Sequence, residues 1–245
     1  MPQLPVPSTG AARVLVTRPL QDARHWVQQL QQSGFTAEAL PLIDIAPAAD
    51  ARAAGRAWQA LGGYAACMFV SGNAVEYFFK QNMALAKVAP GHIATKTIAS
   101  NAPGLPTSLR FMAPGPGTVA ALLAAGVPAG QIDAPAADAD QFDSEALWAV
   151  VGQRDWQGRR VLVVRGESQG SGGVSSGRDW IARQWEAAGA QVDFVGVYQR
   201  RAPVFTDAQL ERARAASADG SMWLFSSSEA VANLTGLPAL AGFSR

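Results

Sequence analysis

Small polar residues and arginines follow the predicted strands, and they are the side chains best suited to chemistry. Thr17-Arg18 follows the apolar run at residues 14–16, and Ser71-Gly72-Asn73 follows the run at residues 65–70. Ligands of open α/β sheets bind beyond the carboxyl ends of strands. There, helix N-termini and Ser or Thr hydroxyls hold anions. Similar residues follow three further predicted strands: Gly115-Pro116-Gly117-Thr118, Arg165-Gly166-Glu167 and Ser226-Ser227-Ser228. These segments predict a site for a polyanionic small molecule.

Each of these side chains also has a structural interpretation. Ser71, Thr118 and Ser227 precede predicted helices, where an N-cap is a common role for a hydroxyl. Arg18 and Arg165 could form ordinary surface ion pairs. Their equivalent positions after two similar strands favour a functional role, and both interpretations stay open.

Tyr198 is a further candidate, because it lies in an extended segment of a chain with only three tyrosines. It could be a functional phenol or a half-buried strand residue. The Gly/Ser-rich segment at residues 169–177 could be a lid or a plain surface loop. We expect four nearby carboxylates to be solvated or to cap a helix: Asp138, Asp140, Asp143 and Glu145.

The sequence offers few groups for covalent or metal chemistry. Cys67 is the one cysteine and His25 and His92 are the two histidines, which excludes an internal disulfide and a His- or Cys-rich metal centre. Residues 115–118 lack the lysine of a Walker loop and the full dinucleotide fingerprint. We therefore expect no cofactor and no metal, with chemistry that relies on shape, desolvation, hydrogen bonds and weak acids.

Net charge and the search for targeting signals bear on the protein's expected location and partners. A formal net charge of +1 argues against a general nucleic-acid binder. Met1–Ala12 lacks the basic and apolar regions of a secretory signal. The uncharged stretch Phe111–Gly130 is rich in Pro and Gly, which favours a strand-turn-helix over a membrane span. We expect a cytoplasmic protein with no membrane or nucleic-acid partner.

The elements that must position these residues alternate between short apolar strands and amphipathic helices. Residues 65–70 and 161–164 are continuous apolar runs, which are typical of buried parallel strands. Helical periodicity follows several of the runs, and Gly34 and Gly189 are expected to end two of the helices. The pattern predicts an α/β fold with parallel sheets.

The sequence also contains an internal repeat. Residues 13–18 (RVLVTR) resemble residues 160–165 (RVLVVR), and residues 68–75 (MFVSGNAV) resemble residues 224–231 (LFSSSEAV). Extended segments near residues 40–46 and 197–203 fall at corresponding places, so we interpret them as crossings between two domains. Domain one would then comprise residues 1–39 and 204–245, and domain two residues 47–196. Few residues follow Ser227, so we expect domain one to be incomplete.

A set of motifs in matching order resembles the uroporphyrinogen-III synthase family over about residues 13–235. The motifs are Val14-Leu-Val-Thr-Arg-Pro19, Leu40-Pro-Leu-Ile-Asp-Ile-Ala-Pro47, Phe69-Val-Ser-Gly-Asn-Ala-Val75, Gly115-Pro-Gly-Thr118, Phe142-Asp-Ser-Glu-Ala-Leu147, Val164-Arg-Gly-Glu167, Gly177-Arg-Asp-Trp180, Gly189-Ala-Gln-Val192, Val197-Tyr-Gln-Arg200 and Phe225-Ser-Ser-Ser-Glu-Ala-Val231. Residues 91–110 match poorly, the segment at 170–176 is long, and the chain is short at its C-terminus relative to the family.

The resemblance implies two flavodoxin-like parallel-sheet lobes joined by a two-stranded linker, the first lobe being discontinuous, with the active site in the cleft. It implies a cofactor-free cyclisation of hydroxymethylbilane, a linear tetrapyrrole with eight carboxylates. In that reaction the terminal hydroxyl leaves, an azafulvene-like cation forms, and ring D closes with inversion through a spiro intermediate. It also implies a monomer with transient contact to the preceding pathway enzyme.

The resemblance further implies roles for particular residues. Tyr198 matches the family's tyrosine, which acts as the acid for the departing hydroxyl or as its orienter. Ser71, Thr118 and Ser227 match positions that contact substrate carboxylates. Other matching positions line the cleft, with a partly structural role for the serine: Arg18, Ser144, Arg165, Gly166 and Arg178.

Two other functions remain open at this point. A non-catalytic or truncated two-lobed protein could bind an anionic tetrapyrrole, or another small anion, without turnover. A nucleotide-dependent Rossmann enzyme would need a complete phosphate loop, and the sequence contains none.

Overall fold

The computed structural model describes residues 13–86, 105–168 and 176–237; the side chains of 81–86, 168 and 176–178 are outside this description. The expected absence of a secretory signal at residues 1–12 therefore falls outside the described residues, as do most of the segment at 169–177 and most of the poorly matched segment at 91–110. The chain divides into two compact units. Unit 1 comprises Met1–Ile45 and Arg200–Arg245, and unit 2 comprises Ala46–Gln199.

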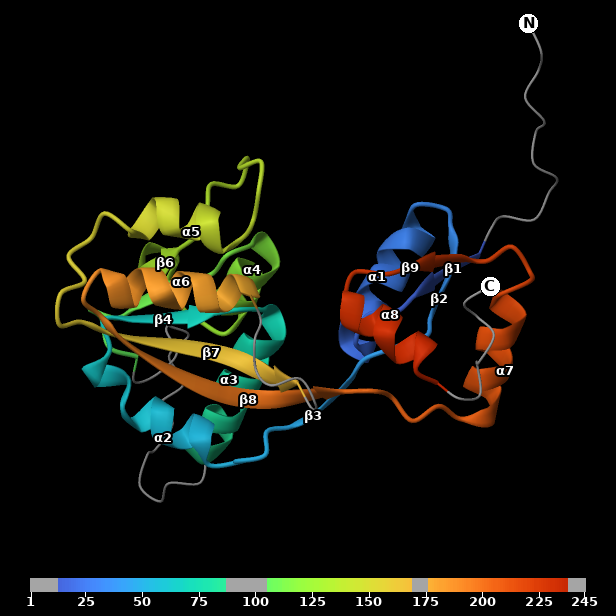
Figure 1. Ribbon diagram of the computed structural model, residues 1–245, viewed down its shortest axis with the longest axis horizontal. Coiled ribbons are helices and arrows are strands. Elements are labelled where there is room, and N and C mark those ends of the chain that lie inside the picture. The colour runs from blue at the N-terminus through green and yellow to red at the C-terminus, as the bar shows by residue number, and fades with distance from the viewer. Residues whose placement is uncertain (1–12, 87–104, 169–175, 238–245) are drawn as a thin grey trace, which may run out of the picture. The chain divides into compact units, whose positions relative to one another are not determined.

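Unit 1 is a parallel sheet with helices on both faces, drawn in blue and in orange to red in Figure 1. The strands follow the order β2-β1-β9, and β1 pairs in parallel with both neighbours. Its elements are β1 (Arg13–Val16), α1 (Leu20–Gln32), β2 (Thr36–Ala39), α7 (Asp207–Ala216), β9 (Met222–Leu224) and α8 (Ser228–Thr235).

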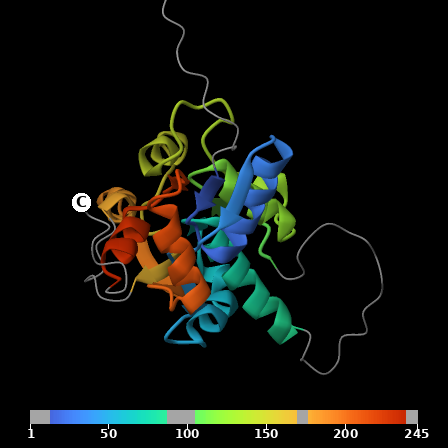
Figure 2. The ribbon, with the colours of Figure 1, turned by 90° about the vertical axis from the view of Figure 1, so that its right-hand side faces the viewer.

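Successive side chains of β1 point to opposite faces of the sheet, and each face has its own hydrophobic core. Val14 and Val16 pack with Ala23 of α1, whereas Leu15 packs with residues of α7 and α8, including Ala213 and Leu234. Successive strand residues point to opposite faces, so the short run VLV buries apolar side chains on both sides. Figure 2 shows α1 on one side of β1 and the C-terminal helices on the other.

The larger sheet lies in unit 2, apart from four strand residues that belong to unit 1: Asp44, Ile45, Arg200 and Arg201. Its strands follow the order β3-β8-β7-β4-β5-β6. The strands are β3 (Asp44–Pro47), β4 (Ala66–Phe69), β5 (Arg110–Met112), β6 (Ile132–Asp133), β7 (Arg160–Ser168) and β8 (Gln191–Arg201). The helices are α2 (Ala53–Gln59), α3 (Gly72–Ala86), α4 (Pro116–Ala124), α5 (Ser144–Val151) and α6 (Ser176–Ala187), with 3-10 turns η1 (Leu61–Gly63) and η2 (Ala129–Gln131).

The two faces of this sheet bury different side chains. Figure 1 shows α5 and α6 on one side and α2 and α3 on the other. On the first side, Trp185 of α6 packs among strand residues such as Met68 and Val163. On the second, Phe69 of β4 and Phe78 of α3 lie with their ring centroids 5.5 Å apart. The apolar runs at 65–70 and 161–164 are therefore covered on both faces, and the expected α/β class with parallel sheets is confirmed.

Helix ends follow the glycines as expected. Gly34 and Gly189 both have φ +86, a left-handed conformation that glycine adopts without steric cost. Each follows the last turn of a helix, α1 and α6 respectively, and directs the chain into the next strand.

Several elements differ from expectation. The strand expected over residues 40–46 begins at Asp44, because Leu40, Leu42 and Ile43 are buried in the core of unit 1. β8 starts earlier, at Gln191, and runs to Arg201. β7 continues to Ser168, so Arg165-Gly166-Glu167 lies within the strand rather than beyond its end. The neighbouring strand β8 is 11 residues long, so its backbone can pair with an extended β7.

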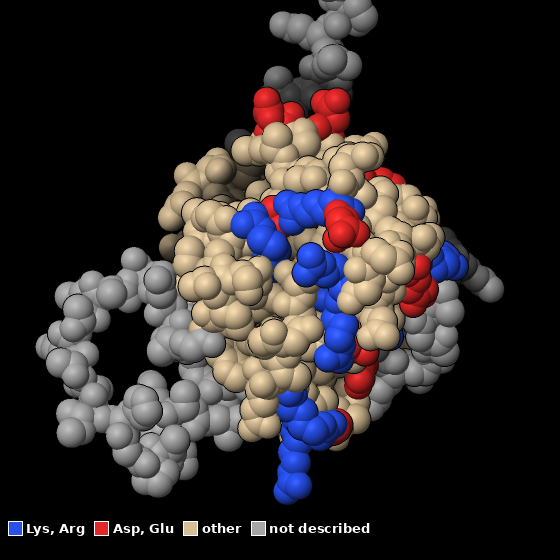
Figure 3. Space-filling model, turned by 90° about the vertical axis from the view of Figure 1, so that its left-hand side faces the viewer, with Lys and Arg blue, Asp and Glu red and all other residues tan. Residues whose placement is uncertain are grey.

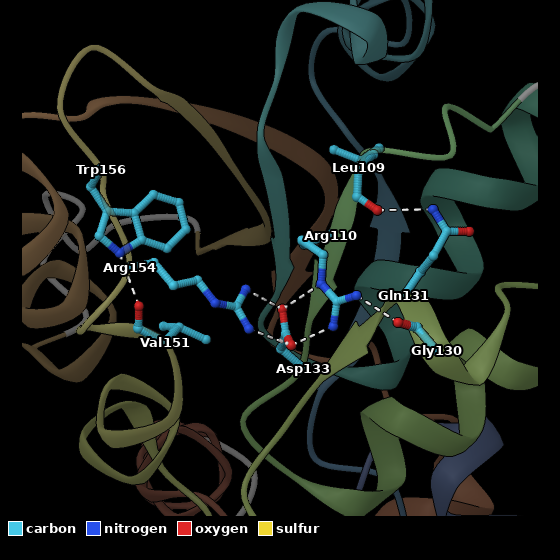
Figure 4. Close-up of polar contacts among 8 residues, drawn as sticks. All are labelled: Leu109, Arg110, Gly130, Gln131, Asp133, Val151, Arg154 and Trp156. Carbon is cyan, nitrogen blue, oxygen red and sulfur yellow. Dashed lines mark hydrogen bonds and ion pairs between the residues drawn. The ribbon is translucent and has the colours of Figure 1, made fainter.

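A charged cluster joins β5, β6 and the segment after α5 at the β6 edge of the larger sheet (Figure 4). Asp133 of β6 accepts hydrogen bonds from Arg110 of β5 at 2.5 and 2.9 Å and from Arg154, which follows α5, at 2.6 and 2.7 Å. Only 6% of the Asp133 side chain is exposed. Burial of this carboxyl opposes its ionisation, but the hydrogen bonds from Arg154 and Arg110 outweigh burial and hold its pKa at about 2.

The Asp133→Asn variant is expected to be less stable at pH 7. A carboxyl whose pKa falls from 3.8 to about 2 on folding stabilises the native state by about 2 kcal/mol. The contribution is present above pH 4 and is lost as the pH falls towards 2, so wild type and variant converge at low pH. Urea denaturation at pH 7 and pH 3 measures the difference.

Asp50→Asn is the matched control, because Asp50 pairs with Arg56 through side chains that are both more than half exposed. Such pairs contribute little to stability, so the control should unfold like the wild type. Equal urea-unfolding midpoints for Asp133→Asn and wild type at pH 7 would contradict the claim that the Asp133 cluster stabilises the fold.

Candidate functional site

The strand order locates the most favourable binding position in unit 2. From β4 the chain continues to β5 and β6 on one side, and then returns to place β7 and β8 on the other side. The point where the order reverses therefore lies between β4 and β7. Ligands of open α/β sheets bind beyond the carboxyl ends of the two strands at such a point. Ser71 follows β4, and Gly166 lies near the carboxyl end of β7.

Three helices begin along this carboxyl edge. Ser71 precedes α3, Thr118 lies in the first turn of α4, and Ser144 is the first residue of α5. A Cβ added at Gly72 would lie 3.7 Å from the Gly117 carbonyl oxygen, and one at Gly115 would lie 3.5 Å from Cβ of Phe142. The starts of α3, α4 and α5 are thus close neighbours in a row.

Each helix start contributes a partial positive charge to this edge. The first N–H groups of a helix lack partners within the helix and carry a partial positive charge. Ser71 Oγ accepts from the N–H of Ala74 at 3.2 Å, and Asp143 caps α5 by accepting from Ala146 at 2.8 Å. The capping interpretation is confirmed for Ser71 and for Asp143. It is wrong for Thr118, because α4 begins at Pro116 and its N-cap is Gly115.

Tyr198 of β8 lies against this row. Its hydroxyl is 3.2 Å from Ser71 Oγ, and either group can be the donor. Its ring centroid is 5.5 Å from that of Tyr77 in α3. Tyr198 is 3% exposed, so the expectation of a half-buried residue is wrong.

Gly166 is what allows the ring to lie there. A Cβ at position 166 would overlap two ring carbons of Tyr198 and come within 2.8 Å of its hydroxyl oxygen. Gly166 thus has a steric role that the sequence alone did not indicate. Ser71, Gly166 and Tyr198 come from three elements and form one contact group, which places a phenol and an alcohol beside a helix N-terminus.

Three further predicted residues of unit 2 have other contacts or are buried. Arg165 forms an ion pair with Asp179 of α6 at 3.7 Å, and its guanidinium lies 4.5 Å from the ring centroid of Phe194. Thr118 and Ser144 are buried, at 7% and 8% exposed. Arg178 lies in α6, and its side chain is outside the described part of the chain.

The strand order of unit 1 also reverses, between β1 and β9. Thr17 is fully buried after β1, and its hydroxyl donates to the carbonyl of Leu224 at 2.8 Å. Arg18 follows, with Asp22 at 3.2 Å. Ser227 caps α8 by accepting from the N–H of Glu229 at 3.2 Å, so its capping interpretation is confirmed. Arg18 and Ser227 therefore follow the two strands that flank this point.

Sequence reasoning missed three aromatic residues near the candidate positions. Tyr77 lies beside Tyr198, Trp26 beside Arg18, and Phe194 beside Arg165. No motif distinguished them. The exposed fractions of Trp26 and Phe194, 38% and 42%, could not be obtained from the sequence, because both residues occupy positions that also suit core packing.

Two further properties concern only the described residues. No group of three or more His, Cys, Asp or Glu side chains among them is placed to hold a metal ion. No helix among them has both the length and the apolar character needed to cross a bilayer.

Cys67 is fully buried, and burial raises the pKa of its thiol.

The fold and the two strand-order reversals define a two-unit, parallel α/β protein with polar residues at the carboxyl ends of its strands. The sequence matches the family model of uroporphyrinogen-III synthase HemD over residues 24–239, so the chain belongs to the uroporphyrinogen-III synthase family. No curated protein sequence matches the chain.

Solved structures to which this chain is similar come from the extremely thermophilic bacterium Thermus thermophilus. A mutant uroporphyrinogen III synthase is 16% identical with a TM-score of 0.54, and the match covers 95% of this chain and 80% of that one. The wild-type enzyme in a second crystal form is 17% identical with a TM-score of 0.46, covering 92% and 76%. A further Thermus thermophilus uroporphyrinogen III synthase is 14% identical with a TM-score of 0.43, covering 91% and 76%.

The Gly166→Ala variant is expected to displace the Tyr198 ring. Overpacking of this kind costs roughly 1–3 kcal/mol, and it should separate the Tyr198 hydroxyl from Ser71. Urea denaturation measures the stability. Tyrosine ring resonances report the displacement, and the chain has only three tyrosines to assign.

Gly62→Ala serves as the control, because a Cβ at position 62 meets no atom within 4 Å. It should leave both stability and the Tyr198 resonances unchanged. Wild-type stability and wild-type Tyr198 resonances in Gly166→Ala would show that the ring does not depend on this glycine.

Proposed function

We propose that this chain is a uroporphyrinogen-III synthase of tetrapyrrole (haem) biosynthesis. It would cyclise hydroxymethylbilane without a cofactor, inverting ring D through a spiro intermediate. Membership of the family supports the class of activity. The observation that carries the assignment of a site is the Tyr198–Ser71 contact of 3.2 Å at the strand-order reversal of unit 2.

The residues present suit this chemistry. Departure of the terminal hydroxyl as water needs a proton, and the phenol of Tyr198 can supply one or hold the hydroxyl in position. The Ser71 hydroxyl accepts from Ala74 N–H and can still donate to the phenol oxygen. It would stabilise negative charge that develops there when the proton leaves. The proton released from the closing pyrrole carbon then restores the phenol.

The helix starts would hold the substrate while it reacts. Hydroxymethylbilane carries several carboxylates, and the N-termini of α3 and α4 favour negative charge through first-turn N–H groups, whereas the N-terminus of α5 already carries the Asp143 carboxylate. From unit 1, Arg18 and Ser227 would provide further donors. Binding at several carboxylates fixes the conformation of the linear chain, and we infer that this restraint selects the inverted ring closure over the uninverted one.

Product analysis tests the proposed function. Purified protein mixed with hydroxymethylbilane should give the type III isomer, whereas spontaneous closure gives type I. Oxidation of the products to porphyrins and separation of the isomers by chromatography gives their ratio. Type I as the sole product would contradict the assignment. Tetrapyrrole binding without turnover would instead identify a non-catalytic binder.

The Tyr198→Phe variant is expected to fold and to form type III product more slowly. General acid catalysis typically contributes about 10²–10⁴-fold, so a fall in kcat of about 10²-fold or more would fit the role of acid. A smaller fall would fit the role of orienter. Single-turnover kinetics with isomer analysis measures the rate, and thermal unfolding checks the fold. Unchanged kinetics would remove Tyr198 from the mechanism.

A further inference from the structure

An arginine in unit 1 is held by one carboxylate and one aromatic ring. Arg18 follows β1 and forms an ion pair at 3.2 Å with Asp22, in the first turn of α1. Its guanidinium carbon lies 5.5 Å from the ring centroid of Trp26, one turn further along the same helix. The arginine side chain is 31% exposed, and Trp26 is itself 38% exposed.

Unit 2 repeats this set of side chains at the matching strand. Arg165 near the end of β7 forms an ion pair at 3.7 Å with Asp179, in the first turn of α6. Its guanidinium carbon lies 4.5 Å from the ring centroid of Phe194, which comes from the neighbouring strand β8. The arginine side chain is 26% exposed and Phe194 is 42% exposed. The aromatic residue thus comes from a different element, while the arginine and the aspartate occupy equivalent places.

The two partners restrict the guanidinium in different ways. An aromatic face attracts a cation that lies within about 6 Å of the ring centroid. Arginine is planar and presents five N–H donors, so contact with a ring face limits the directions in which those donors can point. The aspartate engages one edge of that plane. The other donors can then meet a carboxylate in a bidentate geometry.

We propose that Trp26 and Phe194 are positioning residues that hold Arg18 and Arg165 as two matched carboxylate anchors, one in each unit. The inference rests on the proposed function in one respect, because it takes the ligand to be a polycarboxylate tetrapyrrole. Both arginines lie at strand-order reversals of their sheets, where α/β proteins bind ligands. Both rings remain substantially exposed, so core packing does not account for their positions.

The chain provides a matched comparison at the opposite end of β7. Arg160, the first residue of that strand, pairs with Asp193 at 2.6 Å and lies 4.5 Å from the ring centroid of Tyr64. It has the same three kinds of side chain, but lies about 16 Å from Arg165 at the usual rise of an extended strand. Figure 3 shows this end of unit 2, where basic and acidic side chains are interspersed. A purely structural role for such groups predicts similar behaviour at both ends.

The test compares leucine variants at the three rings. Phe194→Leu and Trp26→Leu remove the ring face and keep an apolar side chain. We expect each to raise KM for hydroxymethylbilane about two- to fivefold with little change in kcat, and the double variant to raise it about tenfold. Phe194→Tyr and Trp26→Phe retain a ring face and should restore KM. Tyr64→Leu should leave KM unchanged.

A second measurement separates this inference from the proposed function. Uroporphyrin, a stable octacarboxylate, serves as a binding probe in isothermal titration calorimetry, and its Kd should rise in parallel with KM. Type III product with KM and Kd unchanged in both leucine variants would overturn the anchors and leave the function standing. Type I product alone, with uroporphyrin binding weakened by leucine and restored by the aromatic variants, would support the anchors and reject the function. An equal rise in KM or Kd for Tyr64→Leu would contradict the proposal that Arg18 and Arg165 are anchors.

Discussion

The contact between Gly166 and the Tyr198 ring is the constraint on which the candidate site depends. Because position 166 has no side chain, the ring lies against β7 and its hydroxyl reaches Ser71 at the start of α3. This one contact links β7, β8 and the β4–α3 connection at the carboxyl edge of the sheet. The proposed chemistry requires that link, since a phenol elsewhere on β8 would not share a hydrogen bond with the cap of α3.

The two ends of the parallel sheet in unit 2 have different roles in this view. At one end and along the β6 edge, arginines are neutralised by aspartates, as in the cluster around Asp133 and in the Arg160–Asp193 pair. At the carboxyl end, three helix N-termini and two hydroxyl-bearing residues, Ser71 and Tyr198, lie together, while Asp143 caps α5 and Asp179 pairs with Arg165. The proposed anion site would thus lie at the end of β7 opposite to the Arg160–Asp193 pair.

Local signals in the sequence predicted much of the fold. The apolar runs at 65–70 and 161–164 became buried strands, the similar segments RVLVTR and RVLVVR became the starts of matching strand–helix units, and Gly34 and Gly189 ended their helices. Contacts between distant residues were not predictable. Ser71 and Tyr198 are 127 positions apart, and nothing local to Gly166 indicates which ring it accommodates. The extra length of β7 likewise depends on its neighbour β8.

A double-mutant cycle on Ser71 and Tyr198 tests the central claim most directly. Single-turnover rates of type III formation would be measured for the wild type, Ser71→Ala, Tyr198→Phe and the double variant. If the serine acts through the phenol, its loss should matter little once the phenol is gone. We therefore expect a coupling energy of about 0.5–3 kcal/mol, as is usual for residues in contact. Fully additive effects would contradict the claim that the Ser71–Tyr198 contact is the chemically active unit.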